Sequence, residues 1–238
     1  MEMPDRIRPG GGEMFDSIAP RYDFLNHVLS LGADRHWRFL AASALLFPRE
    51  GQPRRILDVA TGTGDLAFAV LSRDLRCRVV GVDPSPKMLA IARQKAAQRA
   101  LTSRLELCSG DAETLPFSDH SFDGAGIAFG IRNVPDRLRA LGQMARVCKR
   151  GGRIVVLELA EPRAGLLGAA ARFYIRHVLP HLAAMLSHSS PYRYLQTSMA
   201  AFPPADEFAA LMTQAGIDVL AVKRLMFGAA VLFVGEAR

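Results

Sequence analysis

The sequence predicts an α/β fold built on a mostly parallel sheet, with helices on both faces. Short apolar runs with the length of strands alternate with amphipathic stretches long enough for helices. Half of the 238 residues are hydrophobic and only 8% are aromatic, which is typical of α/β rather than all-β proteins. Strands joined through helices form right-handed crossover units, and such units build parallel sheets.

The predicted elements follow one another in regular order. Residues 1–12 are polar and rich in Pro and Gly, which predicts a disordered tail, whereas residues 13–50 have the apolar spacing of a helical cap. Strands are expected at 54–60, 78–83, 104–109, 122–128, 153–159, 217–225 and 229–236. The helices after the cap are expected at 65–73, 85–99, 135–149, 163–186 and 203–216. Pro135 at the first turn and Gly151 just past the end punctuate the helix 135–149.

The last two of these seven strands are separated only by residues 226–228. A connection that short joins strands only as a hairpin, so the final strand is expected to run antiparallel. Residues 13–238 are long enough for one such domain, and no linker or internal repeat divides them.

Charge and cysteine content narrow the class of protein. The net charge is +7, but the basic residues are scattered and no aromatic side chains interleave with them, so nucleic acid is disfavoured. An anionic membrane surface and an ordinary arginine-rich composition both remain open. The three cysteines lack metal-binding spacing, which indicates reduced thiols in a cytoplasmic protein without a metal. No signal peptide or run of about 18 apolar residues is present, so no transmembrane helix is expected.

A glycine turn follows the first predicted strand. Gly62 and Gly64, with Thr63 between them, let the backbone turn sharply and approach a ligand. Ala67 completes a GxGxxA pattern, and Asp83 ends the next strand 83 − 64 = 19 residues after Gly64. A carboxylate at that position accepts hydrogen bonds from ribose hydroxyls, so these residues suit NAD as well as S-adenosylmethionine.

Further acidic residues favour S-adenosylmethionine. Asp58 lies within the first strand, where a carboxylate would organise the glycine loop and hold a cationic ligand but repel a pyrophosphate. Asp65 opens the next helix, and its charge suits a helix start without phosphate. Asp111 and Ala112 follow the third strand, where an Asp can bond an adenine amino group. The alternative is that Asp58 and Asp65 only cap local backbone groups.

Four segments resemble the UbiE-type ubiquinone/menaquinone C-methyltransferases, and the likeness covers roughly residues 13–236. They are Phe15-Asp16-Ser17-Ile18-Ala19-Pro20-Arg21-Tyr22-Asp23-Phe24-Leu25-Asn26 followed by Ser30-Leu31-Gly32 and Trp37, then Phe129-Gly130-Ile131-Arg132-Asn133-Val134, then 146–158, and finally Tyr192-Arg193-Tyr194-Leu195 with Ser198 and Phe202-Pro203. The resemblance implies a Rossmann-like class I methyltransferase with a seven-stranded sheet. It also implies contacts to S-adenosylmethionine from Thr63, Asp83, Asp111 and Ala112. Relatives often carry Ser at position 128 and His at position 233, where this chain has Ala and Phe.

The implied reaction is C-methylation of a reduced isoprenoid quinol, either demethylmenaquinol or the benzoquinol precursor of ubiquinone. Arg132 is the first candidate for the catalytic side, with Asn133, Tyr22 and Asp23 around it. An arginine there stabilises a developing phenolate or orients a water molecule, but it is too basic to serve as the base. Two alternatives stay open: Arg132 pairs with an acid to fix its loop, and Asp23 is a helix cap rather than a base.

Residues 163–203 are expected to form a substrate lid, in which His177 and Tyr194 are weaker candidates for substrate contact. The apolar part of this region would cover an isoprenoid tail and graze the inner face of the membrane, or it would simply pack on the sheet. A homodimer is left open. The competing functions are a methyltransferase for another small acceptor, a non-catalytic S-adenosylmethionine-binding scaffold, and a nicotinamide dehydrogenase.

Overall fold

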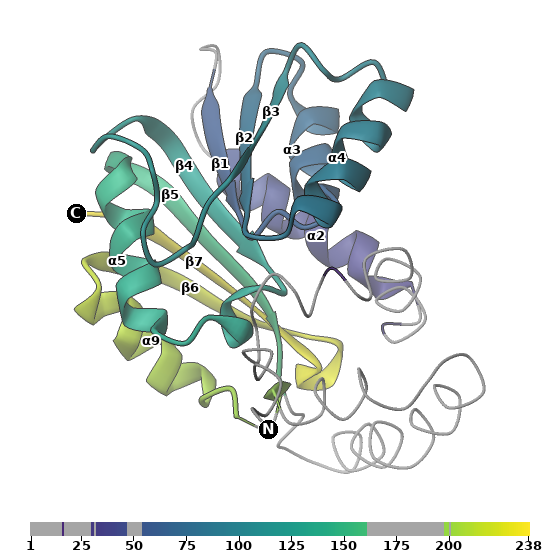
Figure 1. The fold of residues 1–238 in the computed structure, drawn as a ribbon. Coiled ribbons are helices and arrows are strands. Elements are labelled where there is room, and N and C mark those ends of the chain that lie inside the picture. Colours follow the sequence, from purple (N-terminus) through teal and green to yellow (C-terminus); the bar gives the residue numbers. More distant parts are fainter. Residues whose placement is uncertain (1–15, 17–29, 31, 47–53, 161–197, 200) are drawn as a thin grey trace, which may run out of the picture.

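A sheet of seven strands runs through the part of the chain that the computed structural model describes, which is residues 16, 30, 32–46, 54–160, 198–199 and 201–238 (Figure 1). The strands are β1 (Arg55–Val59), β2 (Arg78–Asp83), β3 (Leu105–Ser109), β4 (Phe122–Ala128), β5 (Cys148–Leu159), β6 (Ile217–Leu225) and β7 (Ala230–Ala237). The helices are α2 (Ala33–Leu46), α3 (Asp65–Arg73), α4 (Pro86–Gln98), α5 (Arg137–Val147) and α9 (Ala205–Gln214). The predicted tail, most of the cap and nearly all of the lid lie outside the described residues.

The strand order is β3-β2-β1-β4-β5-β7-β6. Strands β1 to β5 pair in parallel, and β7 runs antiparallel to both of its neighbours. The seven strands and the antiparallel hairpin at the end are therefore confirmed. The order reverses between β1 and β4, and the carboxyl ends of the strands at such a reversal form the crevice where open α/β sheets bind ligands.

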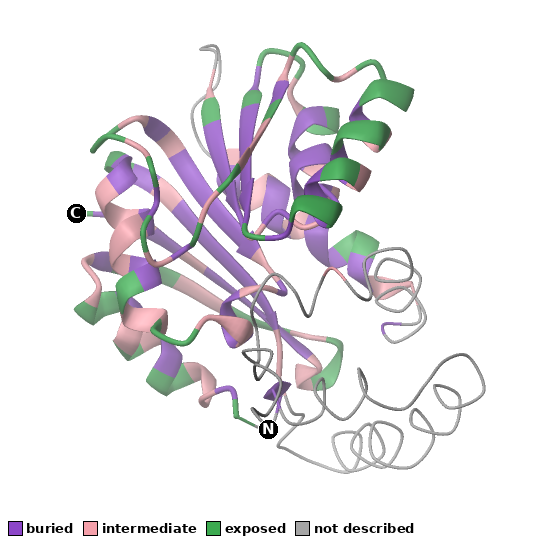
Figure 2. Cartoon of the chain, in the orientation of Figure 1, coloured by how far each residue is buried: buried purple, intermediate pink, exposed green. Residues whose placement is uncertain are grey.

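Two helical layers cover the sheet, as predicted. Helices α2, α3 and α4 lie on one face, and α5 and α9 lie on the other (Figure 1). Alternate residues of the strands point to the two layers, so that Leu57 and Val59 join the cluster under α5 while Ile56 joins the cluster under α2 and α3. The central strands are buried on both faces (Figure 2), which explains why they read as continuous apolar runs.

Helix α4 begins where the sequence predicts it. Ser85 is the N-cap, its hydroxyl accepts a hydrogen bond from the Met88 amide over 3.1 Å, and Pro86 occupies the first turn. Helix α5 differs from its prediction at both ends, although its existence is confirmed. It begins at Arg137 because Asp136, not Pro135, caps it by accepting from the Arg139 amide over 2.9 Å.

The carboxyl end of α5 was predicted at residue 149, but the helix ends at Val147. Cys148 already pairs with Phe122 at the start of β4, and the Ser121 amide donates to the Val147 carbonyl. Strand β5 consequently begins at Cys148 rather than at residue 153, and it passes through Gly151 in a left-handed conformation.

The cysteines carry free thiols. Burial raises the pKa of Cys77 and of Cys148 to about 12, and it raises the pKa of Cys108 as well. Cys77 and Cys148 are buried and pack as small apolar side chains, whereas Cys108 is partly buried. None of the described helices is both long enough and apolar enough to cross a membrane.

Candidate cofactor and catalytic site

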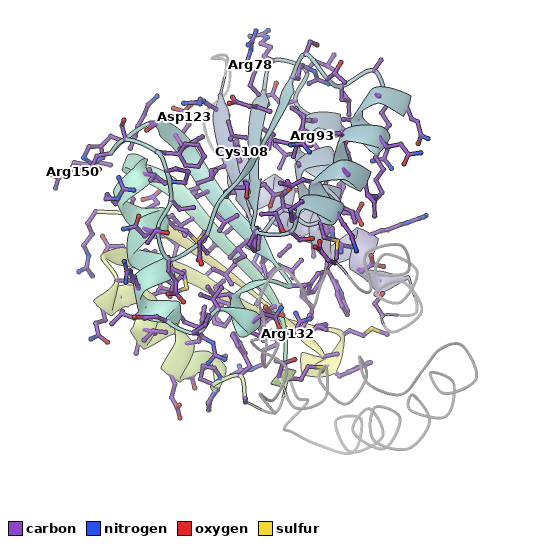
Figure 3. All side chains as sticks on the ribbon, viewed as in Figure 1. Arg78, Arg93, Cys108, Asp123, Arg132 and Arg150 are labelled. Carbon is purple, nitrogen blue, oxygen red and sulfur yellow. The ribbon has the colours of Figure 1, made fainter. Side chains whose placement is uncertain are left out.

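The sequence-predicted site residues that the structure describes lie at the carboxyl ends of β1 to β4. We call this end of the sheet the site edge. Arg132 lies at this edge, whereas Arg78 and Asp123 mark the opposite edge, where the strands begin (Figure 3). The residues at the site edge are Asp58, Gly62, Thr63, Gly64, Asp83, Asp111, Ala112, Arg132 and Asn133. Tyr22, Asp23, His177 and Tyr194 lie outside the described residues, so their roles stay predictions.

Asp58 holds the glycine loop in place through hydrogen bonds to its side chain. Its side chain is buried, and its Oδ2 accepts hydrogen bonds from the Thr61 hydroxyl over 2.6 Å and from the Ala67 amide over 3.0 Å. The Gly64 amide closes the turn onto the Thr61 carbonyl over 2.9 Å. Gly62 and Gly64 have φ angles of +56° and +90°, which favour glycine. Asp58 thus fixes the shape of the loop, and any direct hold on a ligand stays a prediction.

The same burial changes the acidity of Asp58. Loss of hydration raises its pKa from the ordinary 3.8 to about 7, and the negative charge of Asp83 adds to this. The hydrogen bonds from Thr61 and Ala67, together with the charge of Arg38, oppose the rise in pKa without cancelling it. Between about pH 4 and pH 7 this carboxyl is therefore mostly protonated in the folded protein but mostly ionised in the unfolded chain.

We expect the free energy of unfolding to reflect this difference. Because the pKa of Asp58 is raised on folding, its contribution to stability is full below about pH 4 and is lost as pH rises to about 7. Relative to Asp58→Asn, the free energy of unfolding of wild type should fall on the order of 1 kcal/mol per pH unit across that window. Above about pH 7 the difference between the two proteins should stay constant. Urea unfolding of both proteins between about pH 5 and pH 8 measures the slope. A difference independent of pH would contradict it.

Asp83 provides the second fixed carboxylate, at the end of β2. Its Oδ2 accepts from the Gly62 amide and its Oδ1 from the Ser85 amide, each over 2.8 Å. Burial raises the pKa of Asp83, while these two bonds oppose the rise. Each carboxylate oxygen has a second lone pair, so the group can accept from a diol without giving up the loop.

The space beside Gly62 fits a ligand that approaches the backbone. A Cβ built on Gly62 would meet nothing within 4 Å, whereas one on Gly64 would meet the Phe68 ring at 2.9 Å. Gly64 is therefore needed for packing, and Gly62 faces open room next to the Asp83 carboxylate. A ribose diol and a cationic sulfonium suit this acidic surrounding better than a pyrophosphate does.

Asp111 and Ala112 lie beyond the end of β3, as expected. Asp111 is exposed, its Oδ1 accepts from the Glu113 amide over 2.8 Å, and it forms a short bridge with Thr114. Ala112 is buried against the core. The pair stands on the same side of β1 as Asp83, one strand farther out.

Lys95 is a part of the site that sequence patterns did not predict. Its Nζ lies 2.9 Å from the Thr63 Oγ1 and 2.9 Å from the Asp65 Oδ1. Arg38 also faces Asp65, with its Nη2 3.9 Å from Oδ2. The charge of Asp65 is thereby compensated, so Asp65 argues less against a phosphate than its position in the sequence suggested. No local spacing links residue 95 to residue 63; only the packing of α4 beside α3 does.

We expect Lys95→Met to weaken cofactor use. The substitution removes one charge-assisted bond to Thr63 from a partly buried site, which should raise the KM for S-adenosylmethionine about fivefold and leave kcat nearly unchanged. Steady-state methyl transfer measures both constants. Arg93→Met, an exposed residue of the same helix, is the matched control and should change neither. An equal rise in KM in both variants would indicate a general disturbance of α4.

Arg132 is held in a buried ion pair. Its Nη1 donates to Glu158 Oε1 and to the Phe129 carbonyl, each over 2.6 Å, and its amide donates to Glu158 Oε2 over 3.1 Å. The side chains of Arg132 and Glu158 are 4% and 0% exposed. The residues Ile131–Asn133 form a 3-10 turn that starts after Phe129, whose φ is +58°. This pairing is the alternative that the sequence left open for Arg132; contact with a substrate stays a prediction.

Asp16 also lies at this edge. Its Oδ1 accepts from the Ser85 hydroxyl and, over 3.2 Å, from the Lys87 amide. Because Ser85 follows Asp83 closely, Asp16 lies near the second carboxylate, at the amino end of α4. Among the described residues, no group of three or more side chains that could hold a metal ion is present.

A parallel sheet whose strand order reverses between β1 and β4, an antiparallel last strand and a glycine loop beside Asp83 define the Rossmann-like class I methyltransferase fold. Solved structures agree. The [4+2]-cyclase SpnF is 19% identical with a TM-score of 0.69, and the match covers 94% of each chain. A SAM-dependent methyltransferase from Thermotoga maritima is 23% identical with a TM-score of 0.65, covering 95% of this chain and 99% of that one. At such low identity the likeness shows the fold alone.

The chain belongs to the ubiE/COQ5 methyltransferase family, whose model matches residues 8–236. A demethylmenaquinone methyltransferase from Deinococcus radiodurans is 47% identical over 227 residues, which cover 95% of this chain and 92% of the relative. The ubiquinone/menaquinone biosynthesis C-methyltransferase UbiE from Geobacter sulfurreducens is 42% identical over 236 residues, 99% of this chain and 90% of the relative. The resemblance in the four sequence segments is therefore confirmed.

Proposed function

We propose that this chain transfers a methyl group from S-adenosylmethionine to a ring carbon of a demethylated isoprenoid quinol. The observation that carries the proposal is the similarity to quinone methyltransferases along nearly the whole chain, from the cofactor loop through the loop of Arg132 to the last strand. The acceptor is demethylmenaquinol, the benzoquinol precursor of ubiquinone, or both, because relatives are named for both quinones.

The cofactor would be held by the fixed groups at the site edge. Asp83 would accept from the ribose hydroxyls, Asp111 with Ala112 would bind the adenine, and the loop of Gly62, Thr63 and Gly64 would cradle the methionine part. When bound, S-adenosylmethionine supplies an electrophilic methyl group on a positively charged sulfur. The work of the protein is to align that methyl with the ring carbon and to exclude water.

On the acceptor side, a carbon–carbon bond forms, the methyl–sulfur bond breaks, and a ring proton leaves to a base. We assign Arg132 and Asn133 to orient and stabilise the quinol oxygen, with Tyr22 close by and Asp23 as the base. Glu158 acts as a positioning residue, because it fixes both the side chain and the amide of Arg132. His177 and Tyr194 would contact the rest of the substrate, within a lid at 163–203 of a single domain, 13–238.

The test is methyl transfer from labelled S-adenosylmethionine to short-tailed demethylmenaquinol and to a short-tailed demethylated benzoquinol, with the oxidised quinones in parallel. Only the reduced rings should accept the methyl group, because carbon methylation needs an electron-rich ring. The quinol that is methylated faster identifies the pathway. Arg132→Lys keeps the charge but loses the planar fork, so it should lower kcat at least about tenfold. Arg139→Lys, an exposed arginine of α5, is the matched control. Cofactor binding without transfer to either quinol would overturn the proposal.

A further inference from the structure

The hairpin between β6 and β7 ends in a strained turn. Residues Met226–Gly228 form a 3-10 turn in which Met226, Phe227 and Gly228 have φ angles of 44°, 57° and 91°. Left-handed backbone is unfavourable for bulky side chains and persists where the surroundings enforce it. Here the Ala229 amide bonds to the Met226 carbonyl over 3.1 Å, and the Ala160 amide bonds to the Ala229 carbonyl over 3.0 Å.

This turn presents large apolar side chains to solvent. Met226 is 43% exposed and Phe227 is 64% exposed, and Leu220 on the same hairpin is 51% exposed. Among the described residues, the other large hydrophobic side chains with such exposure are Phe39 and Leu75. Met226 and Phe227 are adjacent at the tip, whereas Leu220 lies farther back on β6, so the tip itself is the exposed apolar surface that a partner or a lipid interface would cover.

Positive charge lies directly beside the turn. Lys223 and Arg224 are exposed and precede the apolar tip on the edge strand β6. The nearest acid that the structure pairs with them is Asp206, 3.7 Å from Arg224; both side chains are solvent-exposed, so this pair holds the charge only weakly. An apolar tip flanked by basic residues matches the interface of an anionic lipid bilayer. A lysine on an edge strand also disfavours pairing with the edge of a second copy.

The hairpin tip lies at the same edge of the sheet as the candidate site. Leu225, Ala230 and Leu159 stand in register across β6, β7 and β5, one residue past Glu158. In Figure 1 the turn lies at the end of the sheet where β4 and β5 finish. A flat surface against the tip would therefore face the edge where Arg132 and the glycine loop lie.

We propose that the tip, Met226–Gly228 with Lys223 and Arg224, docks the protein on an anionic phospholipid bilayer. Met226 and Phe227 enter the headgroup region while the two cations contact lipid phosphates. The benefit for catalysis rests on the proposed function, because a long-tailed quinol is dissolved in that bilayer; the docking itself does not depend on it. The residues of the tip are separate in the sequence from the predicted lid at 163–203.

Sedimentation with vesicles of phosphatidylcholine, with and without phosphatidylglycerol, tests the docking. Wild type should bind the anionic vesicles more tightly. Met226→Asn with Phe227→Asn should reduce binding at least about tenfold, because the removed apolar area no longer enters the interface. Asparagine tolerates left-handed backbone, so the double variant should fold at least as well as wild type. Lys223→Gln and Arg224→Gln should each reduce binding about fivefold, in a salt-dependent manner.

The matched controls lie at the other edge of the sheet. Leu75→Asn removes an exposed apolar side chain between α3 and β2, and Arg150→Gln removes an exposed charge at the start of β5 (Figure 3). Neither should change vesicle binding. The proposal would be overturned if the control variants lost as much vesicle binding as the tip variants, or if the tip variants bound vesicles as tightly as wild type. So would a dimer that the tip variants dissociate without any effect on vesicles, since that result would assign the surface to a second copy.

Methyl transfer separates this proposal from the proposed function. The tip variants should act normally on a short-tailed quinol in buffer and lose activity only with a long-tailed quinol in vesicles. Failure of wild type on the short-tailed quinol would overturn the function and leave the vesicle result standing. Full activity of the tip variants on vesicle-borne quinol would show that the tip does not dock the protein.

Discussion

Glu158→Ala is expected to destabilise the protein by about 3–5 kcal/mol, because it leaves the Arg132 guanidinium buried without its carboxylate. The loss also removes the acceptor for the amides of Arg132 and Leu159, which bond to Glu158 over 3.1 Å and 2.8 Å. Urea unfolding of wild type and variant measures the difference in free energy. Methyl transfer should fall with it, since the loop that carries Arg132 and Asn133 loses its anchor.

A second variant separates folding from chemistry. Arg132→Met combined with Glu158→Leu replaces the pair with apolar side chains of similar volume, and such replacements recover most of the stability that a single removal costs. Methyl transfer should stay lost, because the guanidinium is gone. Lys149→Met is the control: Lys149 pairs with Asp123 over 2.7 Å but is half exposed, so its loss should cost less than about 1 kcal/mol. A double variant with full activity would show that Arg132 only shapes its loop.

Local patterns predicted the fold well because its elements are encoded locally. Buried strands read as apolar runs, and the short separation of β6 and β7 sufficed to predict their direction. The ends of α5 were harder to predict from the sequence. Whether Asp136 or Pro135 begins the helix depends on a side-chain bond, and whether the helix continues past Val147 depends on pairing with β4. Neither interaction is visible in the spacing of apolar residues.

Partners across the sheet could not be predicted in the same way. Glu158 meets Arg132 because β4 and β5 pair with Ala128 opposite Leu157, which brings the ends of the two strands together. An acid inside the otherwise apolar end of β5 was the available signal, since a buried carboxylate requires a partner. Lys95 gave no such signal, because a lysine near the end of a helix is ordinarily solvated.

Asp83→Ala is expected to raise the Kd for S-adenosylmethionine about a hundredfold. The variant removes the acceptor proposed for the ribose hydroxyls and releases the Gly62 amide, which it holds at 2.8 Å, so the cradle loses both a contact and its shape. A hundredfold change corresponds to about 2.7 kcal/mol, within the range of two charge-assisted hydrogen bonds. Titration calorimetry measures Kd directly, and urea unfolding of the same variant reports the structural part of the loss.

Asp123 offers a matched comparison, because its carboxylate also accepts a backbone amide hydrogen bond but lies at the opposite edge of the sheet. Its carboxylate accepts from the Arg55 amide over 2.8 Å and from Lys149 over 2.7 Å, far from the glycine loop (Figure 3). Asp123→Ala should therefore lower the free energy of unfolding without changing the Kd for S-adenosylmethionine. If Asp83→Ala behaved in the same way, Asp83 would be a structural cap of the loop, and the ribose hydroxyls would have to be bound elsewhere along this edge.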